Sequence, residues 1–138
     1  MVTIRMCFFG DSITNGTGDQ AMLGWPGRAC AAAATQGHNV TLYNLGVRGH
    51  SSEDIRGRWL REAQARMPDG MNNHLIFSFG LNDGLILDNG QFRVLPHRTL
   101  DNAEAILREA KAWLPTLFVG LAPVDDAFLC SSDSDYIT

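Results

Sequence analysis

Short apolar segments alternate with longer segments of helical pattern along this chain, and each short segment is followed by a glycine. We predict four strands from the short segments, at residues 2–9, 40–45, 75–79 and 116–119. These segments are rich in β-branched and aromatic residues and do not alternate strictly between apolar and polar positions. This pattern is typical of strands that are buried on both faces of a parallel sheet.

Three predicted helices separate the strands, at residues 26–36, 51–67 and 101–114. Ser51 and Ser52 are N-cap candidates for the second helix, because a serine hydroxyl accepts a hydrogen bond from the main-chain N–H groups of a first turn. Ile55, Trp59 and Ala63 then recur every four residues. We therefore predict that one apolar face of this helix packs on the core.

The third helix is predicted to begin at Asp101, because Asp101 and Glu104 have the spacing of a capping box, and Pro115 ends it. The resulting order β-α-β-α-β-α-β predicts an α/β fold, a three-layer α/β/α sandwich around a mostly parallel sheet. A length of 138 residues predicts that residues 1–138 belong to a single domain. No helical pattern follows the fourth strand, so we expect one face of the sheet to be thinly covered.

Composition and charge exclude several classes of function. The net charge is −4 and the 11 Lys and Arg residues are spread along the chain, so we expect no nucleic-acid partner. The apolar runs are far shorter than the ~20 residues of a membrane span, and no signal-peptide pattern is visible. Cys7, Cys30 and Cys130 lack disulfide or zinc spacing, which favours reduced thiols in a cytoplasmic protein. Asp125 and Asp126 also lack paired ligand spacing, so we expect no metal ion.

Ligands of open parallel sheets bind beyond the carboxyl ends of the strands. Here that rule selects the loops that begin at Gly10, Gly46, Gly80 and Gly120. In the first loop, the Ser12 hydroxyl is placed to attack a carbonyl, provided that a base accepts its proton. The alternative is that Ser12 only caps a following helix. A phosphate site is a further option, although the loop lacks the lysine of a Walker motif and the third glycine of a dinucleotide fingerprint.

The next two loops carry hydrogen-bond donors. Gly46 places a main-chain N–H at the end of the second strand, and Asn82 places a side-chain amide just beyond the third. Acyl transfer produces a tetrahedral oxyanion, which donors of these two kinds stabilise. Each loop alone has a simpler explanation, because glycines end strands and the Asn82–Asp83 pair is typical of turns.

Three blocks of the sequence together resemble the GDSL or SGNH hydrolase family: Gly10-Asp11-Ser12-Ile13-Thr14, Gly46 after an apolar strand, and Gly80-Leu81-Asn82-Asp83. The resemblance implies a flavodoxin-like sandwich that hydrolyses small-molecule carboxylic esters without a cofactor. It implies that Ser12 is the nucleophile and that the Ser12 N–H, the Gly46 N–H and the Asn82 side chain form the oxyanion hole. Substrates across the family are short-chain acyl esters, lysophospholipids and acetylated sugars. Asp11 and Asp83 match motif positions, and we expect them to stabilise their loops.

The chain departs from the family pattern near its C-terminal end. The family carries its general base and the orienting carboxylate in an Asp-x-x-His block, and no histidine of this sequence has that spacing or follows the fourth strand. We therefore expect a domain that stops short of this block. Among the histidines present, His50 is the best placed substitute, because it follows a strand end. His38 and His74 fall at strand starts, and His97 is expected on a surface loop.

Three hypotheses follow from these residues. The first is a serine esterase of the GDSL type that uses Ser12. The second is an inactive or fragmentary family member that binds a small ester or sugar, because the base is missing. The third is a flavodoxin-like phosphate or nucleotide binder that uses the loop 10–18. We also expect this chain alone to be marginally stable, with association of a second copy as one way to cover the exposed face.

Overall fold

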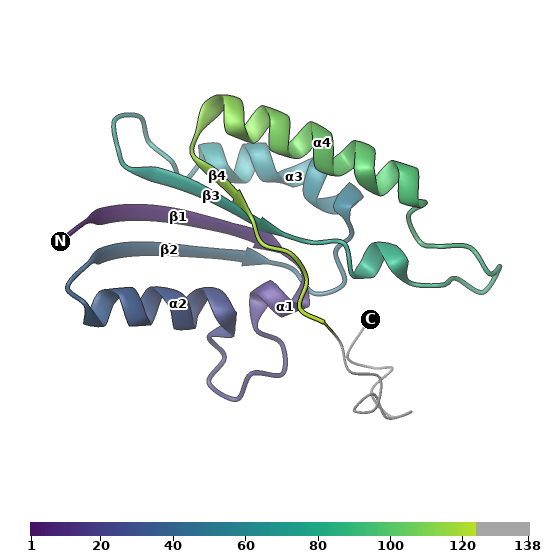
Figure 1. The fold of residues 1–138 in the computed structure, drawn as a ribbon, viewed down its shortest axis with the longest axis horizontal. Coiled ribbons are helices and arrows are strands. Elements are labelled where there is room, and N and C mark those ends of the chain that lie inside the picture. Colours follow the sequence, from purple (N-terminus) through teal and green to yellow (C-terminus); the bar gives the residue numbers. More distant parts are fainter. Residues whose placement is uncertain (124–138) are drawn as a thin grey trace.

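The computed structural model describes residues 1–123, which form a four-stranded sheet between two layers of helices (Figure 1). The strands lie side by side in the order β2-β1-β3-β4, and all are parallel. Their bounds are β1 (Thr3–Gly10), β2 (Asn39–Gly46), β3 (Asn73–Ser78) and β4 (Thr116–Phe118). The predicted parallel sheet and the predicted order of elements are confirmed.

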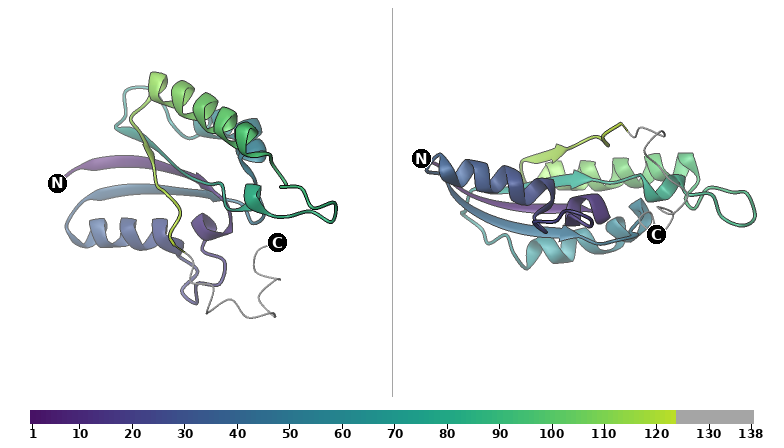
Figure 2. Two further views of the ribbon diagram at one scale, coloured as in Figure 1. Left: turned by 45° about the vertical axis from the view of Figure 1, so that its right-hand side comes forward. Right: turned by 90° about the horizontal axis from the view of Figure 1, so that it is seen from below.

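The helices lie on both faces of this sheet. Figure 2 shows α1 and α2 on one side and α3 and α4 on the other, so the three-layer arrangement is also confirmed. The helical segments are α1 (Ser12–Asn15), α2 (Gly24–Thr35), α3 (Ser52–Gln64), the 3-10 turn η1 (Asn82–Gly84) and α4 (Pro96–Trp113). Ser51 is the N-cap of α3, where it forms a capping box with Asp54.

The start of α4 differs from the prediction. The helix begins at Pro96, and Asp101 lies within it, so the capping box predicted for Asp101 and Glu104 is wrong. Proline fixes φ near the helical value and lacks an N–H, so it suits a first helical position without any side-chain cap. The same shift places His97 in the first turn of α4 and not in a loop, although its side chain is exposed as expected.

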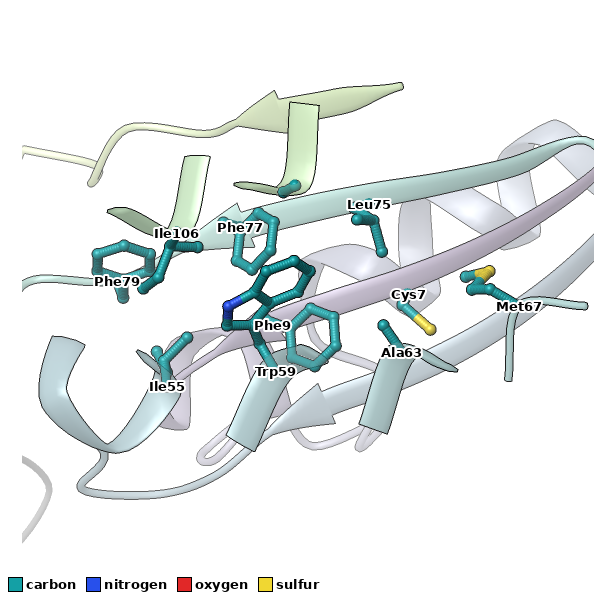
Figure 3. Packing of buried hydrophobic residues seen from close by; sticks show 11 residues of the cluster. Cys7, Phe9, Ile55, Trp59, Ala63, Met67, Leu75, Phe77, Phe79 and Ile106 are labelled. Atoms are coloured by element: carbon teal, nitrogen blue, oxygen red, sulfur yellow. The ribbon is translucent and has the colours of Figure 1, made fainter. Parts of the chain in front are cut away.

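The larger core cluster lies between the sheet and the α3–α4 layer (Figure 3). The face of α3 that carries Ile55, Trp59 and Ala63 is fully buried there, as predicted. The Phe9 and Phe77 rings stack with their centroids 5.2 Å apart, and Trp59 meets Phe77 edge-on at 5.5 Å. Aromatic side chains bury large apolar areas, so this cluster fixes the strands that carry the candidate loops.

The opposite face of the sheet is only partly covered. Here α2 packs over β2, and the Trp25 ring meets Phe8 edge-on at 5.4 Å. Beside it a groove of about 450 Å³ is lined mainly by apolar side chains from α2 and all four strands, among them Met6 and Ile76. Leu117 of β4 also lines this groove and remains 58% exposed. The sheet therefore presents an apolar strip to solvent among the described residues.

Cys7 and Cys30 are buried free thiols. Burial raises the pKa of the Cys7 thiol to about 12, so this side chain behaves as a neutral core residue. Cys130, Asp125 and Asp126 lie outside the described residues. No helix within residues 1–123 has the length and apolar character needed to cross a membrane.

Candidate active site

The three predicted loops begin at the carboxyl-terminal end of the sheet, near α1 (Figure 1). In the parallel ladders, Gly10 pairs with Gly46 on one side and with Ser78 on the other. The carboxyl ends of β1, β2 and β3 are therefore level with one another. Because the loops begin at the same level, they place their first residues around α1.

Two of these strand ends require glycine because α1 approaches them closely. A side chain at Gly10 would clash with Thr14 and with the carbonyl of Ser78, and a side chain at Gly46 would clash with the main chain at Asn15. The first turn after β1 is thus seated directly against its neighbouring strands. This explains why glycine stands at the end of β1 and of β2.

Ser12 is the first helical residue of α1. The Asp11 carboxylate accepts the Ile13 N–H at 3.0 Å, so Asp11 is the N-cap, and the alternative that Ser12 serves only as a cap is wrong. Ser12 is 9% exposed. Among residues 1–123, neither its main-chain N–H nor its hydroxyl has a hydrogen-bond partner. Both groups are therefore unoccupied at the start of a helical turn.

Asp11 acts as a structural residue of this loop, as expected. Burial raises the pKa of its carboxyl group above the ordinary value, and the nearby Asp83 carboxylate adds a smaller increase. One oxygen caps α1, while the other, Oδ2, is buried without a partner among the described residues. The buried carboxyl group is thus held by the turn that it caps.

The second loop presents its donors differently from the prediction. The Gly46 N–H donates to Asn44 Oδ1 at 3.0 Å, and the Asn44 amide donates in turn to the Thr14 carbonyl at 2.8 Å. The role predicted for Gly46 therefore requires that a substrate oxygen replace Asn44 as the acceptor. Gly49, further along the same loop, has a φ of +81° and an N–H with no acceptor among residues 1–123. Positive φ is a conformation that glycine adopts easily, so Gly49 suits this turn. Its N–H is a second candidate donor on this loop, which the motif at Gly46 does not indicate.

The third loop carries Asn82 into the same region. Asn82 is 1% exposed, and its amide donates to the main-chain carbonyl of His50 at 2.9 Å. The neighbouring Asp83 carboxylate accepts the Ser52 N–H at 2.7 Å and the Thr99 hydroxyl at 2.7 Å. The loop after β3 is therefore tied to the loop after β2 and to two helices. Asp83 stabilises this arrangement, as expected.

His50 lies on the loop after β2, but its ring is already engaged. Arg58 donates from Nε to His50 Nδ1 at 3.0 Å, which requires that Nδ1 carry no proton. Burial lowers the pKa of His50, and the Arg58 cation contributes to the same shift. In the neutral ring, Nε2 then holds the proton and Nδ1 accepts from Arg58. His50 in this state has no free nitrogen to accept a proton from Ser12.

His38 and His74 lie far from Ser12, at the amino-terminal ends of β2 and β3. The His38 ring accepts the Val2 N–H at the opposite end of the sheet, and the His74 ring hydrogen-bonds to Asn72 at 2.8 Å. Within residues 1–123, no group of three or more His, Cys, Asp or Glu side chains is arranged to hold a metal ion. The site described thus contains a serine and several hydrogen-bond donors.

Comparisons with solved structures show the same fold. TesA matches with a TM-score of 0.71 and 19% sequence identity, and the match covers 96% of this chain and 68% of TesA. The SGNH-hydrolase family esterase AlinE4 matches with a TM-score of 0.69 and 22% identity over 91% of this chain and 62% of AlinE4. The psychrotrophic esterase EstA from Pseudoalteromonas sp. matches with a TM-score of 0.65 and 21% identity, over 83% of this chain and 57% of EstA.

The chain therefore spans 57% to 68% of the length of these three proteins. A search of curated protein sequences finds no match. A family model matches nearly the whole chain, from residue 8 to residue 136, and this range includes all three sequence blocks. By this match the chain belongs to the GDSL-like lipase/acylhydrolase family.

Proposed function

We propose that this chain hydrolyses carboxylic esters of small molecules, with Ser12 as the nucleophile. The observation that carries the proposal is the position of Ser12, which opens a helical turn between three level strand ends with its hydroxyl and N–H unoccupied by residues 1–123. Family membership and the esterase names of AlinE4 and EstA support the same reaction type.

In the proposed reaction, Ser12 Oγ attacks the ester carbonyl and loses its proton to a base. The carbonyl oxygen becomes an oxyanion, which collapses to an acyl-serine as the alcohol leaves. Water then attacks the acyl-serine and releases the carboxylic acid, which restores the Ser12 hydroxyl. The protein contributes by holding donors around the place where negative charge develops.

We assign two oxyanion donors to the Ser12 N–H and the Asn82 side-chain amide. One Asn82 amide hydrogen is used by the His50 carbonyl, and the side-chain nitrogen carries a second. The loop after β2 supplies the third donor, for which Gly46 is the residue expected from the sequence. Gly49 is the alternative, because its N–H is not committed to Asn44 as that of Gly46 is.

The expected rate of ester hydrolysis depends on which group accepts the proton of Ser12. Since His50 Nδ1 accepts from Arg58, we propose that solvent or an added base accepts the Ser12 proton in this chain. General-base assistance is worth ~10²–10⁴-fold, so turnover by residues 1–138 is expected to be slow by about this factor. The same observation favours a second candidate function, which is binding of a small ester without turnover.

The test is turnover of p-nitrophenyl acetate and butyrate by the 138-residue chain, with and without imidazole as an added base. Ser12→Ala is the subtraction control, because imidazole itself cleaves these esters. Thr17→Ala is the matched variant, since it removes a hydroxyl from the same loop.

After the rate measured with Ser12→Ala is subtracted, we expect turnover that imidazole increases in the parent chain and in Thr17→Ala. Equal rates in all three proteins, under both conditions, would contradict esterase activity. Saturable binding of the ester without turnover would then favour the second candidate.

A further inference from the structure

Arg58, on α3, is a mostly enclosed cation with three different partners. Its side chain is 14% exposed. Nε donates to His50 Nδ1 at 3.0 Å, Nη1 donates to Glu62 at 2.9 Å, and Nη2 donates to the Gly10 carbonyl at 3.2 Å. Its Cζ also lies 5.9 Å from the centre of the Phe9 ring. Every nitrogen of the guanidinium group is therefore used.

Of the two hydrogen bonds that Arg58 makes outside α3, the one to Gly10 reaches the loop that carries the serine. Gly10 is the last residue of β1, and Ser12 follows it by two positions. The Gly10 carbonyl also accepts the Val47 N–H at 3.0 Å, so it joins β1, the loop after β2, and Arg58. The main chain at the end of β1, which leads to Ser12, is thus held by hydrogen bonds from both Arg58 and Val47.

The other hydrogen bond, to the His50 ring, reaches Asn82 indirectly. Arg58 binds the His50 ring, and the His50 main-chain carbonyl accepts the Asn82 amide at 2.9 Å. His50 is therefore held at its side chain and its main chain. Because the guanidinium fork is planar and its donors have fixed directions, one side chain sets the positions of both loops relative to α3.

We propose that Arg58 is a positioning residue, which holds the Ser12 loop and the Asn82 amide in the arrangement that ester hydrolysis requires. This inference rests on the proposed function, and Arg58 itself does not touch the substrate. If Arg58 only stabilised the fold, through its ion pair with Glu62 and its contact with the Phe9 ring, the result would differ. Replacing Arg58 would then lower the thermal unfolding midpoint without changing the reactivity of Ser12.

The experiment compares Arg58→Met and Arg58→Lys with Arg61→Met and Arg61→Lys in the 138-residue chain. Arg61 lies on the same helix, and its side chain is exposed without a hydrogen bond to the described residues. Three quantities are measured for each variant. They are the rate constant for modification of Ser12 by a fluorophosphonate, the ¹⁵N shifts of the His50 ring and the Asn82 amide, and the thermal unfolding midpoint.

We expect Arg58→Met to lower the rate constant for modification of Ser12 roughly tenfold to hundredfold. A displacement of the reacting groups by about 1 Å has an effect of this size. The His50 ring should lose its single tautomer, and the Asn82 amide signals should shift. Arg58→Lys should recover part of the rate, because an ammonium group reaches one acceptor but lacks the fork. The Arg61 variants should match the parent chain in all three measurements.

A Ser12 rate and His50 signals that are equal in the Arg58 and Arg61 variants would overturn the inference. Should Arg58→Met fail to fold, the same comparison is made between Arg58→Lys and Arg61→Lys. If Ser12 of the parent chain does not react at all, the proposed function is contradicted for this chain. The His50 and Asn82 signals then decide separately whether Arg58 positions the two loops.

Discussion

The Asp83 carboxylate accepts the main-chain N–H of Ser52 at 2.7 Å, and both residues are buried. Ser52 opens α3, so the negative charge of Asp83 lies at the positive end of that helix. The other oxygen of Asp83 accepts the Thr99 hydroxyl of α4. A residue next to Asn82 thereby joins both helices of one layer to the loop after β3.

Removal of this carboxylate should destabilise the fold. We expect Asp83→Ala to lower the free energy of unfolding by about 2–3 kcal/mol, because a buried N–H loses a charged acceptor. Asp83→Asn should cost about 1 kcal/mol, since its amide oxygen still accepts from Ser52. Urea unfolding measures both values. Asp88→Ala is the control in the same loop, where the side chain is exposed, and a cost equal to that of Asp83→Ala would refute this account.

Replacement by alanine should have opposite effects on stability at Gly46 and at Gly57. Gly46→Ala introduces a methyl group against the main chain of α1, and we expect a loss of about 1–3 kcal/mol from overpacking. Gly57→Ala lies within α3 with open space around it, and we expect a gain of about 0.5–1 kcal/mol from helix propensity. Thermal or urea unfolding measures both. A stabilising Gly46→Ala would show that α1 does not sit against β2 as described.

The His50 ring should make stability depend on pH. Burial, with Arg58 and Arg93, lowers its pKa from the ordinary value of 6.5, while Asp54 and Glu62 oppose this shift. The unfolded chain then binds a proton at a higher pH than the native ring does. Stability should therefore fall as the pH decreases below about 6.5 and level off below the native pKa.

Urea unfolding at pH 5.5 and pH 7.5 measures this difference, and His50→Gln should reduce it. His97→Gln is the control, because that side chain is exposed at the start of α4. A pH dependence that is the same in His50→Gln and in the parent chain would assign the effect to other groups.

The apolar groove beside α2 should bind a hydrophobic dye under native conditions. We expect 8-anilinonaphthalene-1-sulfonate to fluoresce more strongly with the parent chain than with Leu117→Gln, because Leu117 lines the groove. Leu100→Gln is the control, since Leu100 is 70% exposed on α4 and does not line the groove. Equal dye fluorescence in the two variants would show that the groove is not the binding surface.

Features that depend on nearby residues could be predicted from the sequence. The apolar face of Ile55, Trp59 and Ala63 and the cap at Ser51 follow from helical spacing, and the level strand ends follow from the parallel order of elements. The predicted start of α4 was wrong because Asp101 and Glu104 have capping-box spacing inside a helix that begins at Pro96. Spacing alone does not distinguish these two cases.

The contacts that organise the candidate site could not be predicted in this way. Arg58 and Gly10 are 48 positions apart, and Asn82 and His50 are 32 apart. Such pairs form only when α3 and the strand ends are packed together. The occupied N–H of Gly46 could not be predicted from its place at a strand end either, because its acceptor is the side chain of Asn44, two positions earlier.

The central claim is that the Ser12 hydroxyl is the reactive group of this chain. Incubation of the 138-residue chain with a fluorophosphonate, followed by peptide mass spectrometry, tests it most directly, since the Oγ–P bond forms as fluoride leaves. We predict a single adduct on the peptide that contains Ser12, absent in Ser12→Ala. No adduct, or an adduct that persists in Ser12→Ala, would contradict the claim.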